Sequence, residues 1–172
     1  MVDQYISKSE LSKMILVLLG TQHNGFERLL NAIQSNIDKG VINEEVKVQA
    51  GFTKFESKDM EIFNLIDKSK LLELQDQADL IITHGGVGSI VSSLKKGKKV
   101  IVVPRLKKYG EHVNNHQIQI ARRFAQEGYV KYVLNMKHLE KALKKIKEFE
   151  PRKYESEESN VIAIIEKYID NN

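Results

Sequence analysis

The feature that most limits what this chain can fold into is a set of three short apolar runs. They lie at residues 14–19 (MILVLL), within 79–83 (DLIIT) and within 99–103 (KVIVV). A strand with one face in water alternates apolar and polar side chains, whereas a strand covered on both faces is apolar throughout. All three runs are far shorter than the ~20 residues that cross a bilayer. They therefore predict central strands of a parallel sheet with helices on both faces.

The segments between these runs alternate between helix and strand patterns. Helices are expected at 26–37, 69–77, 89–96, 114–126, 135–148 and 157–169, and further strands at 45–50, 60–66 and 129–133. Ser69 and Asn135 are expected to cap two of the helices. Strands joined by helices of this length predict right-handed crossovers, and hence a Rossmann-like, doubly wound parallel α/β sheet.

Length and composition indicate one globular domain. The 172 residues fit a single domain, with residues 1–13 as an N-terminal extension and residues 152–172 as a C-terminal helix. The net charge of +4 is too small to indicate a nucleic-acid partner by itself, although lysine clusters at 95–99 and 105–108 leave a nucleotide-sensing or basic-patch protein open. The absence of cysteine excludes disulfides and thiolate metal sites. The first ten residues lack the basic-then-apolar order of a signal peptide.

The sequence HGGVGS at 84–89, called the glycine loop below, directly follows one of the buried strands. Its spacing fits neither the G-x-G-x-x-G fingerprint of dinucleotide sites nor a P-loop, which ends in G-K-S or G-K-T. Two interpretations remain open. The loop is either a tight turn in which glycines allow close packing, or a helix N-terminus whose N–H groups and dipole face an anion.

Two other polar loops follow strands of the predicted sheet. GTQHNG at 20–25 follows the first strand, and PRLKKYGEHVNNHQ at 104–117 follows the strand after the glycine loop. Ligands of open parallel sheets bind beyond the carboxyl ends of the strands, so the three loops are expected to meet there around a nucleotide diphosphate with an attached polar group. His84, His112 and His116 lack the spacing of a zinc site, and no D-x-D element is present, so no metal is expected.

Three motifs in this order, THGGVGS (83–89), VIVVPR (100–105) and GEHVNNHQ (110–117), resemble the donor-binding half of GT-B glycosyltransferases of the family 28 C-terminal type. The resemblance extends from residue 14 to about residue 133. In length and motif the chain is similar to small stand-alone members of that family. These include the catalytic subunit of the eukaryotic enzyme that adds N-acetylglucosamine to a dolichol-linked sugar, and subunits of bacterial capsule and exopolysaccharide galactosyltransferases.

The resemblance implies that the glycine loop holds the diphosphate of a UDP-sugar at a helix start. The expected diphosphate contacts are Gly85, Gly86, Gly88 and Ser89. Backbone N–H groups aligned on the diphosphate stabilise the charge that develops on UDP, so neither a metal nor another cofactor is implied. His84 would lie against the sugar or phosphate, and His84 and Glu111 are the expected catalytic residues.

The resemblance also assigns the rest of the cleft. Asn115, His116 and Gln117 would reach hydroxyls of the transferred sugar, while Thr21 and Arg105 would line the same cleft. One position departs from the family pattern. Ser92 stands where the family usually has a glutamate that accepts hydrogen bonds from the ribose hydroxyls, and a neutral serine makes a weaker contact there.

A complete GT-B enzyme has two such domains, and this chain matches one of them. The resemblance therefore implies a hexosyltransferase that works in polysaccharide biosynthesis with a membrane-anchored partner subunit, which holds a lipid-linked saccharide acceptor. The chain would be cytoplasmic and peripheral at the inner face of the membrane. The helix at 157–169 either docks on that partner or packs on its own sheet. The alternative is a non-catalytic accessory subunit that stabilises or enhances a partner glycosyltransferase.

Overall fold

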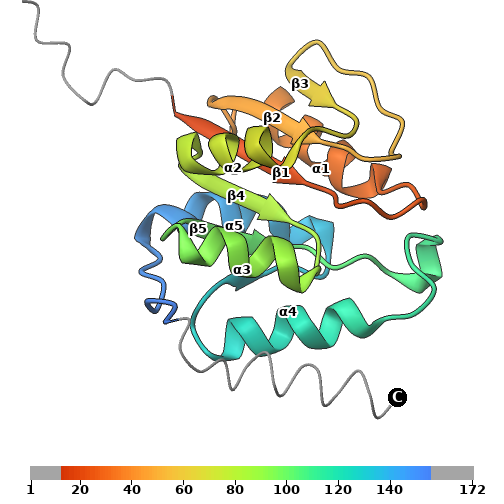
Figure 1. Ribbon diagram of the computed structural model, residues 1–172. Coiled ribbons are helices and arrows are strands. Elements are labelled where there is room, and N and C mark those ends of the chain that lie inside the picture. Colours follow the sequence, from red (N-terminus) through yellow and green to blue (C-terminus); the bar gives the residue numbers. More distant parts are fainter. Residues whose placement is uncertain (1–12, 156–172) are drawn as a thin grey trace, which may run out of the picture.

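The computed structural model describes residues 13–155 (Figure 1). The helix expected at 157–169 and all but the last residue of the expected N-terminal extension lie outside this range. None of the helices within residues 13–155 is long and apolar enough to span a membrane.

Six parallel strands form one sheet in the order β3-β2-β1-β4-β5-β6. They are β1 (Met14–Leu18), β2 (Glu45–Gln49), β3 (Met60–Phe63), β4 (Leu80–Thr83), β5 (Lys99–Val102) and β6 (Lys131–Tyr132). The strand order reverses between β1 and β4, which makes this pair the topological switch point where ligands of such sheets bind. The predicted Rossmann-like, doubly wound parallel sheet is confirmed.

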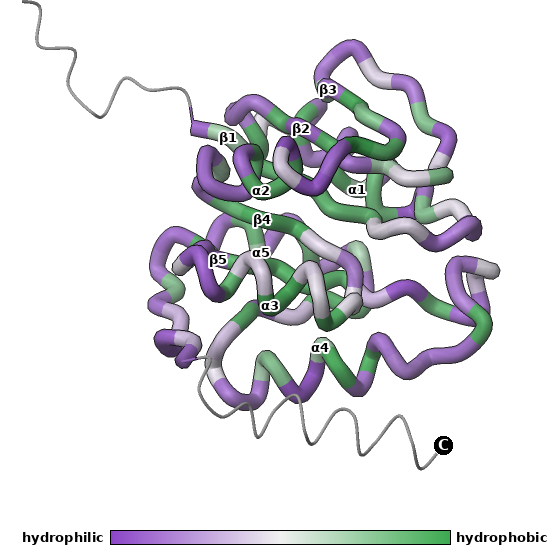
Figure 2. Tube along the Cα trace, in the orientation of Figure 1, coloured by the Kyte–Doolittle hydropathy of each residue, from purple (hydrophilic) through white to green (hydrophobic). Residues whose placement is uncertain are grey.

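Five helices cover the two faces of the sheet (Figure 1). On one face lie α1 (Glu27–Asp38) and α5 (Leu139–Lys145), and on the other lie α2 (Lys68–Gln77), α3 (Val87–Lys95) and α4 (His116–Gln126). Short 3-10 turns add η1 (Lys107–Tyr109), η2 (Met136–His138) and η3 (Ile146–Glu148). The first strand illustrates why the apolar runs are continuous: Ile15 and Val17 pack toward α1, whereas Leu16 and Leu18 pack toward α3 and α4. Figure 2 shows the resulting hydrophobic band along the central strands.

Most element boundaries agree with the sequence within a few residues, and the differences have local causes. α3 begins at Val87 rather than Ser89, since only three residues separate it from β4. The expected Ser69 cap is wrong, because Asp67 occupies the cap position of α2 and Ser69 lies inside the helix. The Asn135 cap is present, but on the 3-10 turn η2, where its side chain accepts a hydrogen bond from the Lys137 N–H. The segment 135–148 is thus a short helix flanked by two tighter turns instead of one long helix.

Candidate functional site

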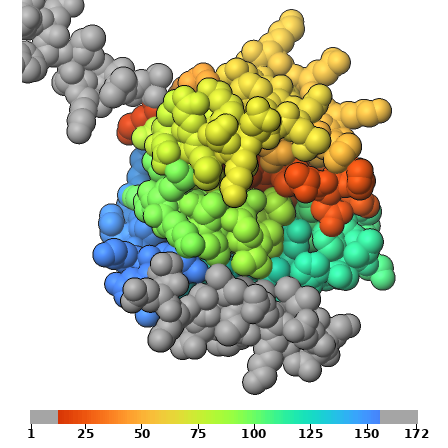
Figure 3. Space-filling view, viewed as in Figure 1, coloured from red at the N-terminus to blue at the C-terminus, as the bar shows by residue number. Residues whose placement is uncertain are grey.

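The loops after β1, β4 and β5 meet at the edge where the strands end, called the carboxyl edge below. Figure 3 shows the segment after β1 (red-orange) lying against the segment before α4 (teal). Hydrogen bonds connect these segments: Asn24 Nδ2 donates to Gly110 O at 2.7 Å, and Gln22 Nε2 lies 3.0 Å from His112 Nε2. The expected meeting of the three loops is confirmed.

The glycines of the glycine loop serve different purposes. A Cβ atom on Gly85 would come within 2.6 Å of Gln117 Cβ, and one on Gly86 would overlap the imidazole of His84. A Cβ atom on Gly88 would have no atom within 4 Å. Gly85 and Gly86 therefore allow close packing, as the first interpretation expects, while Gly88 leaves open space at the start of α3 and the anion-binding interpretation stays a prediction.

The start of α3 offers backbone donors to an anion. Gly86 occupies the cap position with no side-chain cap, and the first helical bond runs from Ile90 N to Gly86 O at 3.1 Å. The earlier N–H groups of the first turn therefore have no acceptor within the helix, and the helix dipole places partial positive charge there. Ser89 adds a half-buried hydroxyl in the same turn. This arrangement suits a phosphate or diphosphate.

His84 packs behind the helix start, and its side chain is almost fully buried. Its Nδ1 accepts a hydrogen bond from Gly86 N at 3.1 Å, and its Nε2 lies 3.5 Å from Ser89 Oγ. Burial, followed by the positive charge of Arg105, lowers the pKa of His84 to about 4. The imidazole is therefore neutral near pH 7.

Gln117 connects the glycine loop to the loop after β5. The side chain is 4% exposed, and its Oε1 accepts hydrogen bonds from Gly85 N and from Arg105 N, both at 3.0 Å. Its Nε2 lies 3.3 Å from His84 Nδ1. The amide thus has partners within the protein at both ends, and the contact with a sugar hydroxyl that the sequence suggests stays a prediction.

Arg105 is completely buried beneath the same loops. Its guanidinium donates to Leu19 O and to Asn24 O at 2.7 Å each, and to Glu111 O at 3.1 Å. It also lies over the ring of Phe26, 4.9 Å from the centroid. Burial lowers the pKa of Arg105 to about 10, so the side chain stays charged at neutral pH. These hydrogen bonds join the loop after β1 to the loop after β5.

Glu111 is buried and paired with Arg28 of α1. Arg28 Nε donates to Oε1 at 2.7 Å, and Arg28 Nη2 donates to Oε2 at 2.9 Å. Glu111 Oε2 also accepts from Leu106 N at 2.9 Å. The carboxylate that the sequence suggests for catalysis is therefore engaged by three internal donors.

The remaining predicted residues of the loops lie at the rim of the site. Thr21 and Asn115 are exposed, and Asn115 Oδ1 accepts from Lys107 N at 2.9 Å. His116 is half-buried, and its ring meets the His112 ring edge-on at 4.7 Å between centroids. Burial lowers the pKa of both histidines. His116 Nδ1 is also bonded to Asn114 Oδ1, so its Nε2 is the ring nitrogen left to face a ligand, and the exposed Thr21 is the other candidate at the rim.

Ser92 faces α2 as well as the site. Its hydroxyl donates to Ser89 O at 3.2 Å and accepts from Gln75 Nε2 at 2.9 Å. Gln75 is fully buried and also donates to Ser93 Oγ at 3.2 Å. The hydroxyl of Ser92 is therefore already used within the protein.

Sequence reasoning overlooked several polar residues that build the site. Arg28 and Gln75 contact the predicted site residues Glu111 and Ser92, while Gln22, which lies in the predicted loop at 20–25, contacts His112. Gln49, at the end of β2, accepts from Gly20 N at 3.2 Å and donates to Gly20 O at 3.1 Å. The one signal in the sequence for Gln49 is a polar residue that interrupts the apolar end of a strand, and Arg28 and Gln75 resemble ordinary exposed helix residues.

An open pocket of about 870 Å³ lies beside these loops at the carboxyl edge. It is lined by residues 51–56, which follow β2, and by Asn64 and Leu65, which follow β3. Gly51 packs against Gly20 O, and Gly20 packs against the ring of His84. The pocket and the glycine loop thus lie on either side of Gly20. Within residues 13–155 no three His, Cys, Asp or Glu side chains are grouped closely enough to hold a metal ion.

A parallel sheet of this order, with a glycine loop opening a helix at its switch point, is the architecture of a Rossmann-like nucleotide-binding domain, the class to which the donor-binding half of a GT-B glycosyltransferase belongs. Comparison with known families agrees. Residues 14–171 match the glycosyltransferase family 28 C-terminal domain, and the chain belongs to this family. The resemblance noted in the sequence is confirmed.

The individual relatives and one solved structure that the chain resembles share one name, ALG13. The chain is 43% identical over 65 residues to the UDP-N-acetylglucosamine transferase subunit ALG13 of Mus musculus, a match covering 38% of this chain and 5% of that protein. It is 31% identical over 112 residues to the subunit of that name from Candida albicans, covering 65% of this chain and 36% of that one. A solution structure of ALG13 superposes with a TM-score of 0.57 at 20% identity, covering 88% of this chain and 94% of that chain. The chain thus spans only part of the length of the curated relatives it matches.

Proposed function

We propose that this protein binds a UDP-sugar and, with a membrane-anchored partner subunit, transfers the sugar to a lipid-linked saccharide. The observation that carries the proposal is the open helix start at Gly88 and Ser89 in a chain of this glycosyltransferase family. The names of the relatives favour UDP-N-acetylglucosamine as the donor.

The geometry supports separate contacts for the diphosphate, the rest of the nucleotide and the sugar at the donor site. The free N–H groups at the start of α3 and the Ser89 hydroxyl would bind the diphosphate, and His84 would lie beside them. The pocket at Asn64 and Leu65 gives room for the rest of the nucleotide on the other side of Gly20. Thr21 and His116 would contact the sugar from the rim.

Transfer breaks the bond between the anomeric carbon and the diphosphate oxygen and forms a bond to the acceptor oxygen. The electron pair of the broken bond goes to UDP, whose new negative charge the helix start stabilises. The acceptor hydroxyl gives up its proton to a base. With a pKa of about 4 the His84 imidazole is too weak a base for this proton, and Glu111 is paired with Arg28, so we assign the base to the partner subunit.

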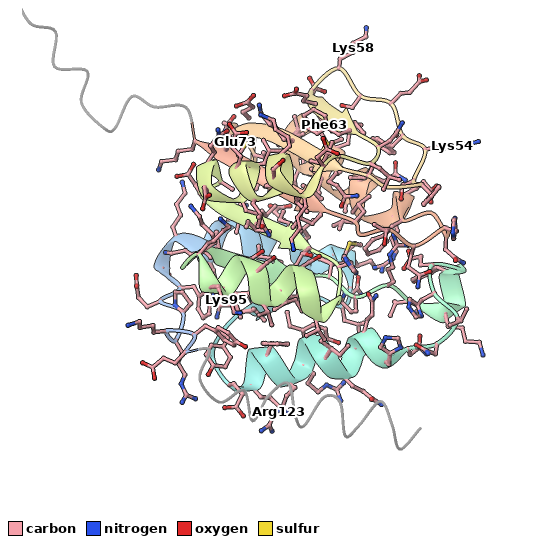
Figure 4. All side chains as sticks on the ribbon, in the orientation of Figure 1. Lys54, Lys58, Phe63, Glu73, Lys95 and Arg123 are labelled. Carbon is pink, nitrogen blue, oxygen red and sulfur yellow. The ribbon has the colours of Figure 1, made fainter. Side chains whose placement is uncertain are left out.

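The distribution of exposed apolar side chains supports a partner at the carboxyl edge. Among residues 13–155 the exposed large hydrophobic side chains are Phe52, Leu65, Tyr109, Val113 and Leu134. Each of them follows a strand, so all lie in loops of that edge. Lys54 and Lys58, in the loop between β2 and β3, are exposed and point outward from the molecule (Figure 4). A second half of the enzyme would cover this apolar surface and close the cleft, and would hold the protein at the inner face of the membrane.

Calorimetry with UDP tests the donor site. We expect a dissociation constant of roughly 1 μM–1 mM, the usual range of enzyme substrates. Gly88→Val fills the open space at the helix start and should abolish binding without disturbing a neighbour. Ser69→Val, which places the same side chain on an exposed position in the first turn of α2, is the matched control and should bind like the wild type. Equal binding by Gly88→Val would contradict the proposed site.

A transfer assay tests the reaction. The protein and membranes of its source organism are incubated with radiolabelled UDP-N-acetylglucosamine, and label is counted in the lipid extract. We expect label only when both the protein and the membranes are present, and less label with Gly88→Val. Label with the protein alone would contradict the need for a partner.

The engaged hydroxyl of Ser92 favours a second candidate function, that of an accessory subunit. Because the Ser92 hydroxyl donates to Ser89 O and accepts from Gln75 Nε2, it has one uncharged lone pair left for the nucleotide, where the family's glutamate offers a charged acceptor. In that case Gly88→Val would leave transfer by the complex unchanged, while omission of the protein would still reduce it.

A further inference from the structure

The orientation of the Gln117 amide is determined by its neighbours. Two backbone N–H groups, those of Gly85 and Arg105, point at the same side-chain atom at 3.0 Å each. An N–H group needs an acceptor, so this atom is the amide oxygen. The NH2 group of Gln117 consequently faces His84 Nδ1, 3.3 Å away.

The same reasoning fixes the state of the imidazole. Nδ1 of His84 receives the N–H of Gly86 at 3.1 Å and faces the NH2 group of Gln117, so two donors point at it and it carries no proton. In a neutral imidazole one nitrogen is a donor and the other an acceptor, so the proton is on Nε2. Nε2 lies 3.5 Å from the hydroxyl of Ser89, in the first turn of α3.

The surroundings of the ring oppose a positive charge. Arg105 and His112, from the segment between β5 and α4, are the charged or titratable groups that act on His84, and both disfavour its protonation. Gly20, in the loop after β1, covers the ring on one side, and Gly86 and Ser89, at the start of α3, cover it on the other; none of them carries a charge.

We propose that Gln117 is a positioning residue that holds His84 as a neutral donor, with its Nε2–H directed toward the anion site at the start of α3. Gln117 acts through His84 and through the Gly85 N–H rather than by touching the transferred sugar. The identity of the anion as UDP rests on the proposed function, whereas the state of His84 in the free protein does not.

Nitrogen-15 NMR of the histidine side chains tests this in the free wild-type protein. We expect His84 to remain the Nε2–H tautomer from about pH 5 to about pH 8, where an ordinary histidine titrates. A Nδ1–H tautomer, an even mixture of the two tautomers, or a midpoint near the ordinary value would overturn the proposal. This measurement needs no variant and no ligand.

Gln117→Glu is the sharpest variant. A glutamate keeps an acceptor for Gly85 N and Arg105 N but replaces the NH2 donor with a carboxylate oxygen, which requires a proton on Nδ1. We expect the pKa of His84 to rise into the range between about pH 6 and about pH 9. Gln119→Glu makes the same change on an exposed position of α4 and should leave His84 as in the wild type. A purely structural role for Gln117 would not move the titration of His84.

The affinity for UDP provides the second readout. Above its new pKa, His84 in Gln117→Glu would carry its proton on Nδ1 and present a lone pair to the anion. UDP binding should then fall roughly 10-fold relative to Gln119→Glu as the pH rises, since a hydrogen bond to a charged group is lost. An unchanged ratio of the two affinities across the pH range would contradict the proposal. If the NMR result is as expected and neither protein binds UDP, the proposed function fails and the positioning role of Gln117 stands.

Discussion

Arg28 and Glu111 form a two-point ion pair that connects α1 to the loop after β5, with N–O distances of 2.7 and 2.9 Å. The Glu111 side chain is 4% exposed and the Arg28 side chain 17%. Glu111 also accepts the Leu106 N–H, so the pair supports the backbone of the loop that carries Arg105. The pair explains how a carboxylate so close to the site contributes to its shape.

Glu111→Ala should destabilise the protein by about 2–4 kcal/mol, because it leaves Arg28 and the Leu106 N–H without their partner. Chemical denaturation measures the change. The double variant Arg28→Ala/Glu111→Ala should lose less free energy of unfolding than the sum of the two single variants, because both changes remove the same ion pair. Glu140→Gln, which removes exposed pairs with Lys39 and Lys144, should have little effect. Fully additive costs for Glu111 and Arg28 would contradict the coupling.

Arg105→Lys should cost about 2–4 kcal/mol, although the charge is kept. A lysine ammonium cannot reach the carbonyl oxygens of Leu19, Asn24 and Glu111 in the planar arrangement of a guanidinium. Thermal denaturation measures the loss, and faster amide exchange in residues 20–25 should accompany it. Arg152→Lys, an exposed position, is the control. Equal stability of the two variants would contradict the bracing role of Arg105.

Gly86→Ala and Gly88→Ala should have opposite effects on stability. The first places a methyl group on the His84 ring and should cost about 1–3 kcal/mol. The second adds a methyl group in open space within a helix and should add about 0.5–1 kcal/mol, since alanine favours helix over glycine. Both should weaken UDP binding. Denaturation and calorimetry on the same samples test the pair, and a destabilised Gly88→Ala would be inconsistent with the open space at Gly88.

Acid should destabilise the protein through His84. The pKa of His84 is about 4 in the folded protein, where the ring is buried, and 6.5 for an ordinary histidine such as that of the unfolded chain. Between these two pH values the unfolded chain therefore binds more protons than the folded protein. The contribution of the neutral histidine is complete above about pH 6.5, falls as the pH drops toward 4, and amounts to about 3 kcal/mol. His84→Asn should lack this part of the pH dependence in denaturation curves measured across that range. Parallel curves for the wild type and His84→Asn would refute it.

The order of helices and strands could be predicted from the sequence because it depends on local pattern. The apolar run at residues 14–19 has no polar alternation, and the strand it forms is covered on both faces. The errors lie where the pattern is short. Residues 129–133 form only a two-residue strand, since β6 is an edge strand that pairs with β5 alone.

The edge that carries the candidate site was predictable as well, because parallel strands end at one edge and HGGVGS opens a helix there. The sequence also determined the family, through three motifs that all lie within the matched residues 14–171. Both results depend on neighbouring residues in the chain, and such relations can be read without coordinates.

Only the tertiary structure decided what the individual side chains do. Gln117 and Arg105 appeared in the sequence as ligand contacts, yet their polar atoms bond to backbone groups from distant segments. Gly86 and Gly88 looked equivalent, but one faces an imidazole and the other open space. The physical reason is that a buried polar group takes whichever partner the folded chain brings within about 3 Å, and that partner lies far away in sequence.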